Sequence, residues 1–326
     1  MRDNFVIEVS EVAKRFGDVV AVDSVTFDLR QGELFGFLGP NGAGKTTTIN
    51  ILTGLARPDA GSIRIAGIDC THRPRAAQHL IGVVPDESNL YPELTGFENL
   101  CFCAALYGLG RGERHTRARE LLNTFGLAEA SDRRFGGYSR GMKRKLTIAA
   151  GIIHKPAILF LDEPTTGIDV ASARQLRQLI ADLHGTGTTV FLTTHYIEEA
   201  ERLCNRVAFI VSGRIVRIDT VEHLIQPTQE KHVVQITCVK TLKDIQGDLS
   251  RSFPHLEFTT PSQSLIRVEA DEPIRVGPLV RFLEDHGAEV SEAQRMRPSL
   301  EDIFVRVTGI EADTMRKEKE RAGGGQ

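Results

Sequence analysis

The sequence predicts an α/β protein that is followed by a small α+β domain, and three patterns support this fold class. Residues 1–225 alternate apolar, β-rich runs with helix-like segments, the order that builds a sheet with helices on its faces. A glycine-rich loop at 39–47 lies between one of these runs and a helix start. Residues 226–309 show the order strand, helix, strand, strand, helix, strand, which is the ferredoxin-like arrangement.

The strand-like segments of the first domain are of two kinds. Residues 6–16 and 20–30 alternate apolar and polar side chains, as half-buried antiparallel strands do, and 61–70 indicates a further hairpin arm. A helix-rich stretch follows at 95–127. Continuous apolar runs, typical of parallel strands covered on both faces, then occur at 157–162, 188–194 and 206–211.

The pattern changes at Pro227, which we expect to mark the boundary between a domain of residues 1–225 and a domain of residues 226–309. The second domain is predicted to close with a helix within residues 298–309. Residues 310–326 are charged and glycine-rich, so we expect a disordered tail there.

Composition narrows the class of protein. With 326 residues, 41% hydrophobic and 25% charged, the chain is typical of a soluble globular protein. It has no apolar stretch near the roughly 18 residues that a membrane span needs. A net charge of −3 gives no electrostatic case for binding nucleic acid. The five cysteines lack metal-ligand spacing, which fits a reducing cytosol.

The loop at 39–47 reads GPNGAGKTT and fits the phosphate-binding pattern G-x-x-x-x-G-K-[ST]. Its glycines let backbone N–H groups turn toward an anion, and the helix dipole adds positive charge at the same point. A glycine-rich surface turn is the alternative, but the flanking strand and helix argue against it. We expect Lys45 to reach the β- and γ-phosphates and the Thr46 hydroxyl to hold Mg²⁺. The predicted nucleotide-binding residues of this loop are Gly39, Pro40, Asn41, Gly42, Ala43, Gly44, Lys45, Thr46 and Thr47.

Two carboxylates, Asp162 and Glu163, follow the apolar run at 157–162. Ligands bind beyond the C-terminal ends of strands in open α/β sheets. In P-loop enzymes the first acid completes the Mg²⁺ shell, and the next can accept a proton from attacking water. Two solvated acids in a strand-end turn are the alternative, which the nearby phosphate loop disfavours.

In their order along residues 1–225, these motifs resemble the ATP-binding subunit of an ABC transporter. The resemblance identifies 39–47 as the Walker A loop and 158–164 as the Walker B strand. It implies a P-loop ATPase fold of ABC type, with a mixed sheet core, an antiparallel β subdomain and a helical subdomain. It also implies ATP and Mg²⁺ as the bound nucleotide and ion. A GTPase or kinase would lack the further motifs of this family.

Three of those further motifs each place one residue at the nucleotide. Phe16 stands where the family has an aromatic that stacks on adenine, although a lone aromatic is more often part of a core. Asp169 is the carboxylate of the D-loop, TTGIDV. His195 stands where the family's histidine contacts the γ-phosphate; a satisfied structural histidine is the alternative.

The segment YSRGMKRK at 138–145 stands at the family's signature, usually LSGGQ. In that family two subunits pair head to tail, so Ser139, Arg140 and Gly141 would meet the ATP of a partner chain. Arg140 replaces a glycine, which is tolerable if its side chain points away from the phosphate or adds charge to it. The basic cluster of Arg140, Lys143, Arg144 and Lys145 is expected to form a solvated helix face rather than a nucleic-acid site.

Asp86 occupies a position where the family commonly has glutamine. Its carboxylate could touch Mg²⁺ or the attacking water, or it could be a surface loop acid. The segment at 87–100 matches the place where the family's permease subunits dock, and it is rich in aromatic and apolar residues.

The C-terminal extension resembles the tail of ATPases that serve ABC-2 type exporters. The expected assembly is therefore an ATPase homodimer with a separate membrane-spanning permease, cytoplasmic and peripheral on the inner face of the membrane. The alternative is a soluble ABC-type ATPase that acts on ribosomes or DNA, although the chain lacks a second ATPase unit and long heptad coils. An RNA-binding module is disfavoured because the central strands of the C-terminal domain, 232–239 and 265–270, carry no aromatic residue.

Overall fold

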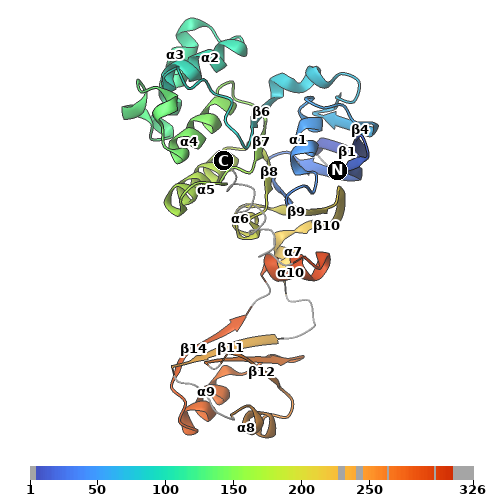
Figure 1. Ribbon diagram of the computed structural model, residues 1–326, viewed down its shortest axis with the longest axis vertical. Helices are drawn as coiled ribbons and strands as arrows, with labels where there is room; N and C mark the ends of the chain where they lie inside the picture. The colour runs from blue at the N-terminus through green and yellow to red at the C-terminus, as the bar shows by residue number, and fades with distance from the viewer. Residues whose placement is uncertain (1–4, 227–231, 240–244, 263, 297–298, 311–326) are drawn as a thin grey trace. The chain divides into compact units, whose positions relative to one another are not determined.

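The computed structural model describes residues 5–226, 232–239, 245–262, 264, 265–296 and 299–310 (Figure 1). These residues form two compact units, which are described separately below. Of the described residues, those up to 221 and those from 304 onward form the first unit, and those between 222 and 303 form the second. The division falls four positions before the boundary expected at residue 225. The tail expected at 310–326 lies outside the described residues from 311 onward.

The first unit is built around a six-stranded mixed sheet of order β10-β9-β3-β8-β7-β6. Five strands run parallel, and β10 is antiparallel to β9. Every residue of β3, β7 and β8 is buried, as continuous apolar runs predict for strands covered on both faces. The strands are β3 (Leu34–Leu38), β6 (Ile81–Val84), β7 (Ile158–Asp162), β8 (Thr189–Thr194), β9 (Arg206–Val211) and β10 (Arg214–Thr220).

A second, antiparallel sheet of order β2-β1-β4-β5 packs in the same unit. Its strands are β1 (Phe5–Phe16), β2 (Val19–Arg30), β4 (Ala60–Ile65) and β5 (Ile68–Asp69). Both sheets contribute to one apolar core, in which Phe27 stacks on Phe35 with ring centroids 5.7 Å apart and Phe191 lies beside both rings. The mixed core and antiparallel subdomain predicted from the sequence are both present.

Six α-helices, α1 to α6, lie within the described residues of this unit. Figure 1 shows α2, α3 and α4 gathered in a lobe across β6 and β7 from α1, which is the expected helical subdomain. Side-chain caps set the starts of three of them: Thr95 and Glu98 form a capping box at α2, Ser139 caps α4 and Asp169 caps α5. The helices are α1 (Lys45–Leu52), α2 (Gly96–Leu106), α3 (Arg111–Thr124), α4 (Arg140–Gly151), α5 (Val170–Gly185) and α6 (Ile197–Leu203).

The second unit has its own four-stranded antiparallel sheet, of order β12-β13-β11-β14. Strands and helices alternate in the order that the sequence predicts, and the unit buries a separate apolar core that includes Val234, Val268 and Leu283. Its elements are β11 (His232–Cys238), α8 (Ile245–Ser252), β12 (Glu257–Ser262), β13 (Leu265–Ala270), α9 (Val276–Asp285) and β14 (Val290–Met296).

Two short helices lie where the division between the units falls: α7 (Val221–Ile225) and α10 (Leu300–Thr308). Ser299 and Asp302 cap the start of α10, and Gly309, with φ of 70°, follows its end. From the sequence, this whole helix is expected in the C-terminal domain of residues 226–309. In the structure its second half belongs to the first unit, because the Phe304 ring packs edge-on against Phe209 of β9 at 5.2 Å.

Candidate functional site

The glycine-rich loop connects β3 to α1, as its sequence predicts. Gly44 has φ of 103°, and a Cβ there would lie 2.3 Å from the carbonyl oxygen of Ala21; a Cβ on Gly39 would lie 2.1 Å from that of Ile210. Only glycine fits at these two positions. No side chain caps α1, and its first turn holds no acid. No side chain therefore occupies the N–H groups at this helix start as a cap, which suits an anionic ligand.

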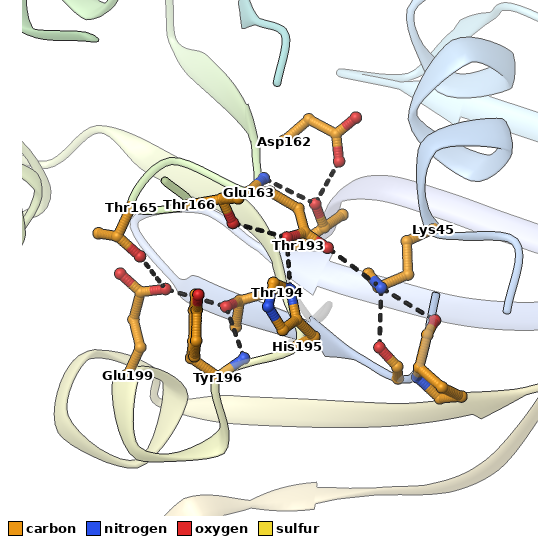
Figure 2. Close-up of polar contacts among 12 residues, drawn as sticks. Lys45, Asp162, Glu163, Thr165, Thr166, Thr193, Thr194, His195, Tyr196 and Glu199 are labelled. Atoms are coloured by element: carbon orange, nitrogen blue, oxygen red, sulfur yellow. Dashed lines mark hydrogen bonds and ion pairs between the residues drawn. The ribbon is translucent and has the colours of Figure 1, made fainter. Parts of the chain in front are cut away.

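Lys45 lies over this loop. Its Nζ donates to the carbonyl oxygens of Gly39 at 2.7 Å and Pro40 at 3.0 Å, and it is 3.2 Å from Glu163 Oε1 (Figure 2). The residue is only 6% exposed. The buried ammonium group supplies a fixed positive charge at the phosphate loop.

Thr46 and Asp162, the two predicted metal ligands, meet in the structure. The Thr46 hydroxyl donates to Asp162 Oδ2 at 2.9 Å, and Thr193 Oγ1 donates to Asp162 Oδ1 at 2.5 Å. Hydroxyl and carboxylate oxygens are the hard donors that Mg²⁺ prefers. Within the described residues no group of three His, Cys, Asp or Glu side chains forms a metal cluster. A pair of protein oxygens fits Mg²⁺, which usually takes one or two protein ligands and completes its shell with phosphates and water.

Glu163 is buried, and three side chains contact its carboxylate: those of Lys45, His195 and Thr166. Its Oε2 accepts from His195 Nδ1 at 2.5 Å and from Thr166 Oγ1 at 2.8 Å (Figure 2). Burial favours the neutral acid, but the hydrogen bond from His195 and the charge of Lys45 outweigh it and lower the pKa of Glu163 to about 2. The carboxylate is therefore ionised at neutral pH and able to accept a proton.

The backbone of Glu163 is unusual because its φ is +48°. A non-glycine residue rarely takes this left-handed conformation, and such residues are often found at functional sites. Its N–H donates to the carbonyl and hydroxyl oxygens of Thr193 on the neighbouring strand β8. This conformation turns the chain sharply just after β7 and directs the carboxylate toward Lys45 and His195.

His195 follows β8 and is 3% exposed. The centroids of its ring and the Tyr196 ring are 4.1 Å apart. The bond of His195 to Glu163 places the ring in the candidate site. Sequence reasoning missed the buried acid next to it, Glu199 of α6. Glu199 Oε2 accepts from the hydroxyls of Thr165 and Thr194, each at 3.0 Å (Figure 2). These bonds tie the segment after Glu163 to the segment that carries His195.

Phe16 ends β1 with 54% of its surface exposed, and Lys14 Nζ lies 5.3 Å from its ring centroid. The alternative that this ring is part of a core is wrong. An exposed face of this kind is available for stacking.

The signature and D-loop segments meet within one chain. Ser139 accepts from the backbone N–H of Met142 at 3.3 Å, and a Cβ on Gly141 would lie 2.5 Å from Ser172 Oγ. Asp169 Oδ1 accepts from the N–H of Ser172 at 2.9 Å, a bond that lowers the pKa of Asp169. The Arg140 guanidinium is exposed, with one long contact of 3.4 Å to the carbonyl oxygen of Gly167.

The described hydrogen bonds of Ser139 and Arg140 go to α4 or to residue 167, rather than to the phosphate loop. The structure thus brings together the P-loop, Asp162, Glu163 and His195, and the described hydrogen bonds of Ser139 and Arg140 do not reach that cluster.

Asp86 is exposed in the loop after β6, and its carbonyl oxygen accepts from Arg144 Nη1 at 3.0 Å. The solvated face expected for the basic cluster is wrong for Arg144, which is 7% exposed. Burial lowers the pKa of its guanidinium, whose other hydrogen bonds go to the carbonyls of Pro85, Asp162 and Pro164. The place of Arg144 on an amphipathic helix could have predicted that it faces inward, but the sequence does not show which groups it contacts.

The segment predicted to dock a permease is partly core and partly surface. Leu90 is buried, while Tyr91 is 48% exposed and packs edge-on against Phe102 of α2 with centroids 5.1 Å apart. Leu106 and Tyr107 at the end of α2 are also exposed. These side chains leave apolar surface open on the helical lobe.

A family model described as "ABC transporter" matches residues 22–166. The linearmycin resistance ATP-binding protein LnrL of Bacillus subtilis is 36% identical over 306 residues, covering 93% of this chain and 98% of the relative. The chain belongs to the ABC transporter family of ATP-binding proteins. Like its family, it binds ATP and is an ATPase.

Two further relatives of this ABC transporter ATP-binding protein extend over nearly its whole length. The doxorubicin resistance ATP-binding protein DrrA of Mycobacterium tuberculosis is 36% identical, covering 94% of both chains. The Nod factor export ATP-binding protein I of Burkholderia lata is 38% identical, covering 94% of this chain and 97% of the relative.

Solved structures match about two thirds of the chain. The structure titled "ATP binding subunit of ABC transporter" has a TM-score of 0.61 and 30% identity, over 67% of this chain and 91% of that one. A dimeric, post-hydrolysis cassette, MJ0796 bound to ADP and Pi, has a TM-score of 0.61 and 26% identity, over 66% of this chain and 98% of that one. Among the described residues of this ABC transporter ATP-binding protein, no helix has both the length and the apolar character needed to cross a membrane.

Proposed function

We propose that this chain is the ATP-hydrolysing subunit of an ABC-2 type exporter and that a separate permease supplies the membrane pathway. The observation that carries the proposal is the extent of the similarity. Relatives named for linearmycin resistance, doxorubicin resistance and Nod factor export match 93–94% of the chain, and so include its C-terminal unit. We assign residues 1–225 to nucleotide binding and residues 226–309 to an accessory role.

The residues of the site have distinct roles in this proposal. The backbone of residues 39–46 and the Lys45 ammonium hold the phosphates, and Phe16 stacks on adenine. Glu163 accepts the proton of the attacking water, an assignment supported by its ionised carboxylate and by its contacts with Lys45 and His195. His195 contacts Glu163, and Glu163 in turn contacts Lys45 of the phosphate loop. This position suits His195 to contact the γ-phosphate.

Thr46 and Asp162 would hold Mg²⁺, which neutralises phosphate charge when it is bound. The Asp86 carboxylate is a further candidate for that ion or for the attacking water. Its support is weaker, because the side chain is exposed.

A head-to-tail homodimer would complete each site. The Ser139 hydroxyl and the N–H groups of Arg140 and Gly141 stand at the start of α4, where an anion is favoured. The described hydrogen bonds of Ser139 and Arg140 do not reach the P-loop within one chain, which supports a contribution in trans, beside the Asp169 segment. The dimeric structures of the related cassette MJ0796 support pairing of two chains.

A permease would dock near residues 87–100, where Tyr91 and the neighbouring Phe102 expose apolar surface. The chain would then be cytoplasmic and peripheral on the inner face of the membrane. Hydrolysis and product release would reopen the dimer, and the opening would move the permease. The alternative, a soluble ABC-type ATPase that acts on ribosomes or DNA, has no support from the names of these relatives.

Affinity purification of the tagged Glu163→Gln variant tests this function. The variant should retain ATP while turnover stops, so the complex should survive extraction in detergent with ATP. We expect a multi-span membrane protein to co-purify in near-equal amount. Lys45→Ala serves as the matched control, because loss of the Lys45 ammonium should prevent ATP binding and with it the ATP-driven closure of the dimer. Ribosomal proteins or DNA without a membrane protein would instead support the soluble alternative.

A further inference from the structure

Arg144 is one of four basic residues on or beside the first turns of α4, and it differs from the others in its surroundings. Its guanidinium is buried, whereas Lys143 lies over the Phe135 ring and Lys145 bonds the side chain of Gln175. The described partners of Arg144 are four backbone carbonyl oxygens. Burial disfavours this cation, nearby carboxylate charges oppose that effect, and the four carbonyls supply the direct hydrogen bonds that a buried charge needs.

Two of the carbonyls flank Glu163. Arg144 Nη2 donates to Asp162 at 2.6 Å, and Nε donates to Pro164 at 2.8 Å. The residue between them has the left-handed φ of +48°. A planar guanidinium fixes both acceptors in one geometry, and it thereby holds the peptide units on each side of Glu163.

The other two carbonyls belong to the loop after β6. Arg144 Nη1 donates to Pro85 and, at 3.0 Å, to Asp86. One rigid group on α4 thus bonds the turn that presents Glu163 and also a loop about 75 positions away in sequence.

We propose that Arg144 is a positioning residue that makes the placement of the Glu163 carboxylate depend on the loop at residues 85–86. This inference rests on the role proposed above for Glu163. A displacement of the loop would pull on the guanidinium and so shift the turn at residues 162–164. Lysine cannot replace arginine here, because an ammonium group is a single point charge and cannot span both segments.

The test compares Arg144→Met and Arg144→Lys in the purified full-length chain, with Lys145→Met as the matched control on the same helix. ATP affinity is measured by equilibrium binding, and kcat is expressed per nucleotide-binding site, so that misfolded molecules do not count. Both Arg144 variants should keep ATP affinity within about threefold, while kcat falls at least about tenfold, since misplacing a catalytic group by about 1 Å can cost 100-fold. Lys145→Met should keep the wild-type kcat.

Hydrogen exchange provides a second readout that general destabilisation would not produce. In Arg144→Lys, exchange should rise together at residues 83–88 and 161–166, with the rest of α4 unchanged. A wild-type kcat in either variant, an equal loss of affinity and turnover, or faster exchange in only one segment would overturn the inference. If Arg144→Met does not fold, Arg144→Lys decides. Wild-type turnover by Glu163→Gln would instead remove the proposed role of Glu163 itself.

Discussion

The His195 Nδ1 atom lies 2.5 Å from Glu163 Oε2, in a pocket where both residues are less than a tenth exposed. The contact places a ring nitrogen against the carboxylate that is positioned to accept a proton. Together with Lys45 on the other oxygen, it keeps Glu163 ionised despite burial. The carboxylate is therefore held in one orientation and one charge state by the protein's own side chains.

The hydrogen bond between Thr46 and Asp162 predicts that a change at Asp162 alters the Mg²⁺ dependence of ATP hydrolysis. Asp162→Asn replaces a charged ligand by a neutral amide, so the Mg²⁺ concentration needed for half-maximal ATPase activity should rise and kcat should fall by about 100-fold. The measurement is ATPase rate against Mg²⁺ concentration at fixed ATP. Asp59→Asn, at an exposed acid that pairs with Lys14, should leave the curve unchanged. An unshifted curve for Asp162→Asn would exclude Asp162 as a ligand.

The exposed ring of Phe16 predicts a loss of affinity without a loss of stability. Base–aromatic stacking contributes about 1–3 kcal/mol, so Phe16→Ala should weaken ATP binding by roughly 5- to 150-fold, while kcat at saturating ATP stays near wild type. Binding and thermal unfolding are measured on the same protein. Val19→Ala, at the 65% exposed residue paired with Phe16, is the control. Unchanged ATP affinity in Phe16→Ala would show that the ring does not contact adenine.

The burial of Glu199 predicts a change in the pH dependence of stability. Burial raises the pKa of Glu199 above its ordinary value of 4.5, although hydrogen bonds from Thr165 and Thr194 oppose the shift. The folded protein then keeps this proton where the unfolded chain releases it. This contribution to the free energy of unfolding is therefore full below pH 4.5 and is lost as pH rises through the folded-state pKa.

Glu199→Gln carries no proton to lose and can still accept from both threonines. Its free energy of unfolding relative to wild type should increase as pH rises above 4.5, by at most about 1.4 kcal/mol per pH unit. Denaturation at several pH values from acidic to neutral measures the difference. Glu198→Gln, at the exposed neighbour, should show no such trend. A pH-independent difference for Glu199→Gln would contradict the raised pKa.

Motifs whose parts are close in sequence could be predicted correctly. The loop at 39–47 needs a strand before it, a helix after it and glycines at two crowded points, and all three requirements are visible locally. The acids Asp162 and Glu163 follow an apolar run, so their place at the end of a buried parallel strand could also be inferred.

Residues whose partners are distant in sequence could not be predicted. Arg144 was grouped with its basic neighbours, because the carbonyls at 85–86 and 162–164 that justify its burial leave no local pattern. Glu199 was missed for the same reason: its acceptor oxygen meets hydroxyls at residues 165 and 194 only in the folded chain. The second half of α10 joins the first unit through the contact of Phe304 with Phe209, which sequence periodicity does not encode.

The most direct test of the account is phosphate release by the purified wild-type chain and by Glu163→Gln, with ATP binding measured on the same samples and Lys45→Ala as the binding-deficient control. We predict that wild type and Glu163→Gln bind ATP about equally, that only wild type releases phosphate, and that the rate for Glu163→Gln is lower by at least about 100-fold. Release at the wild-type rate by Glu163→Gln would contradict the assignment of Glu163 as the proton acceptor at the centre of this site.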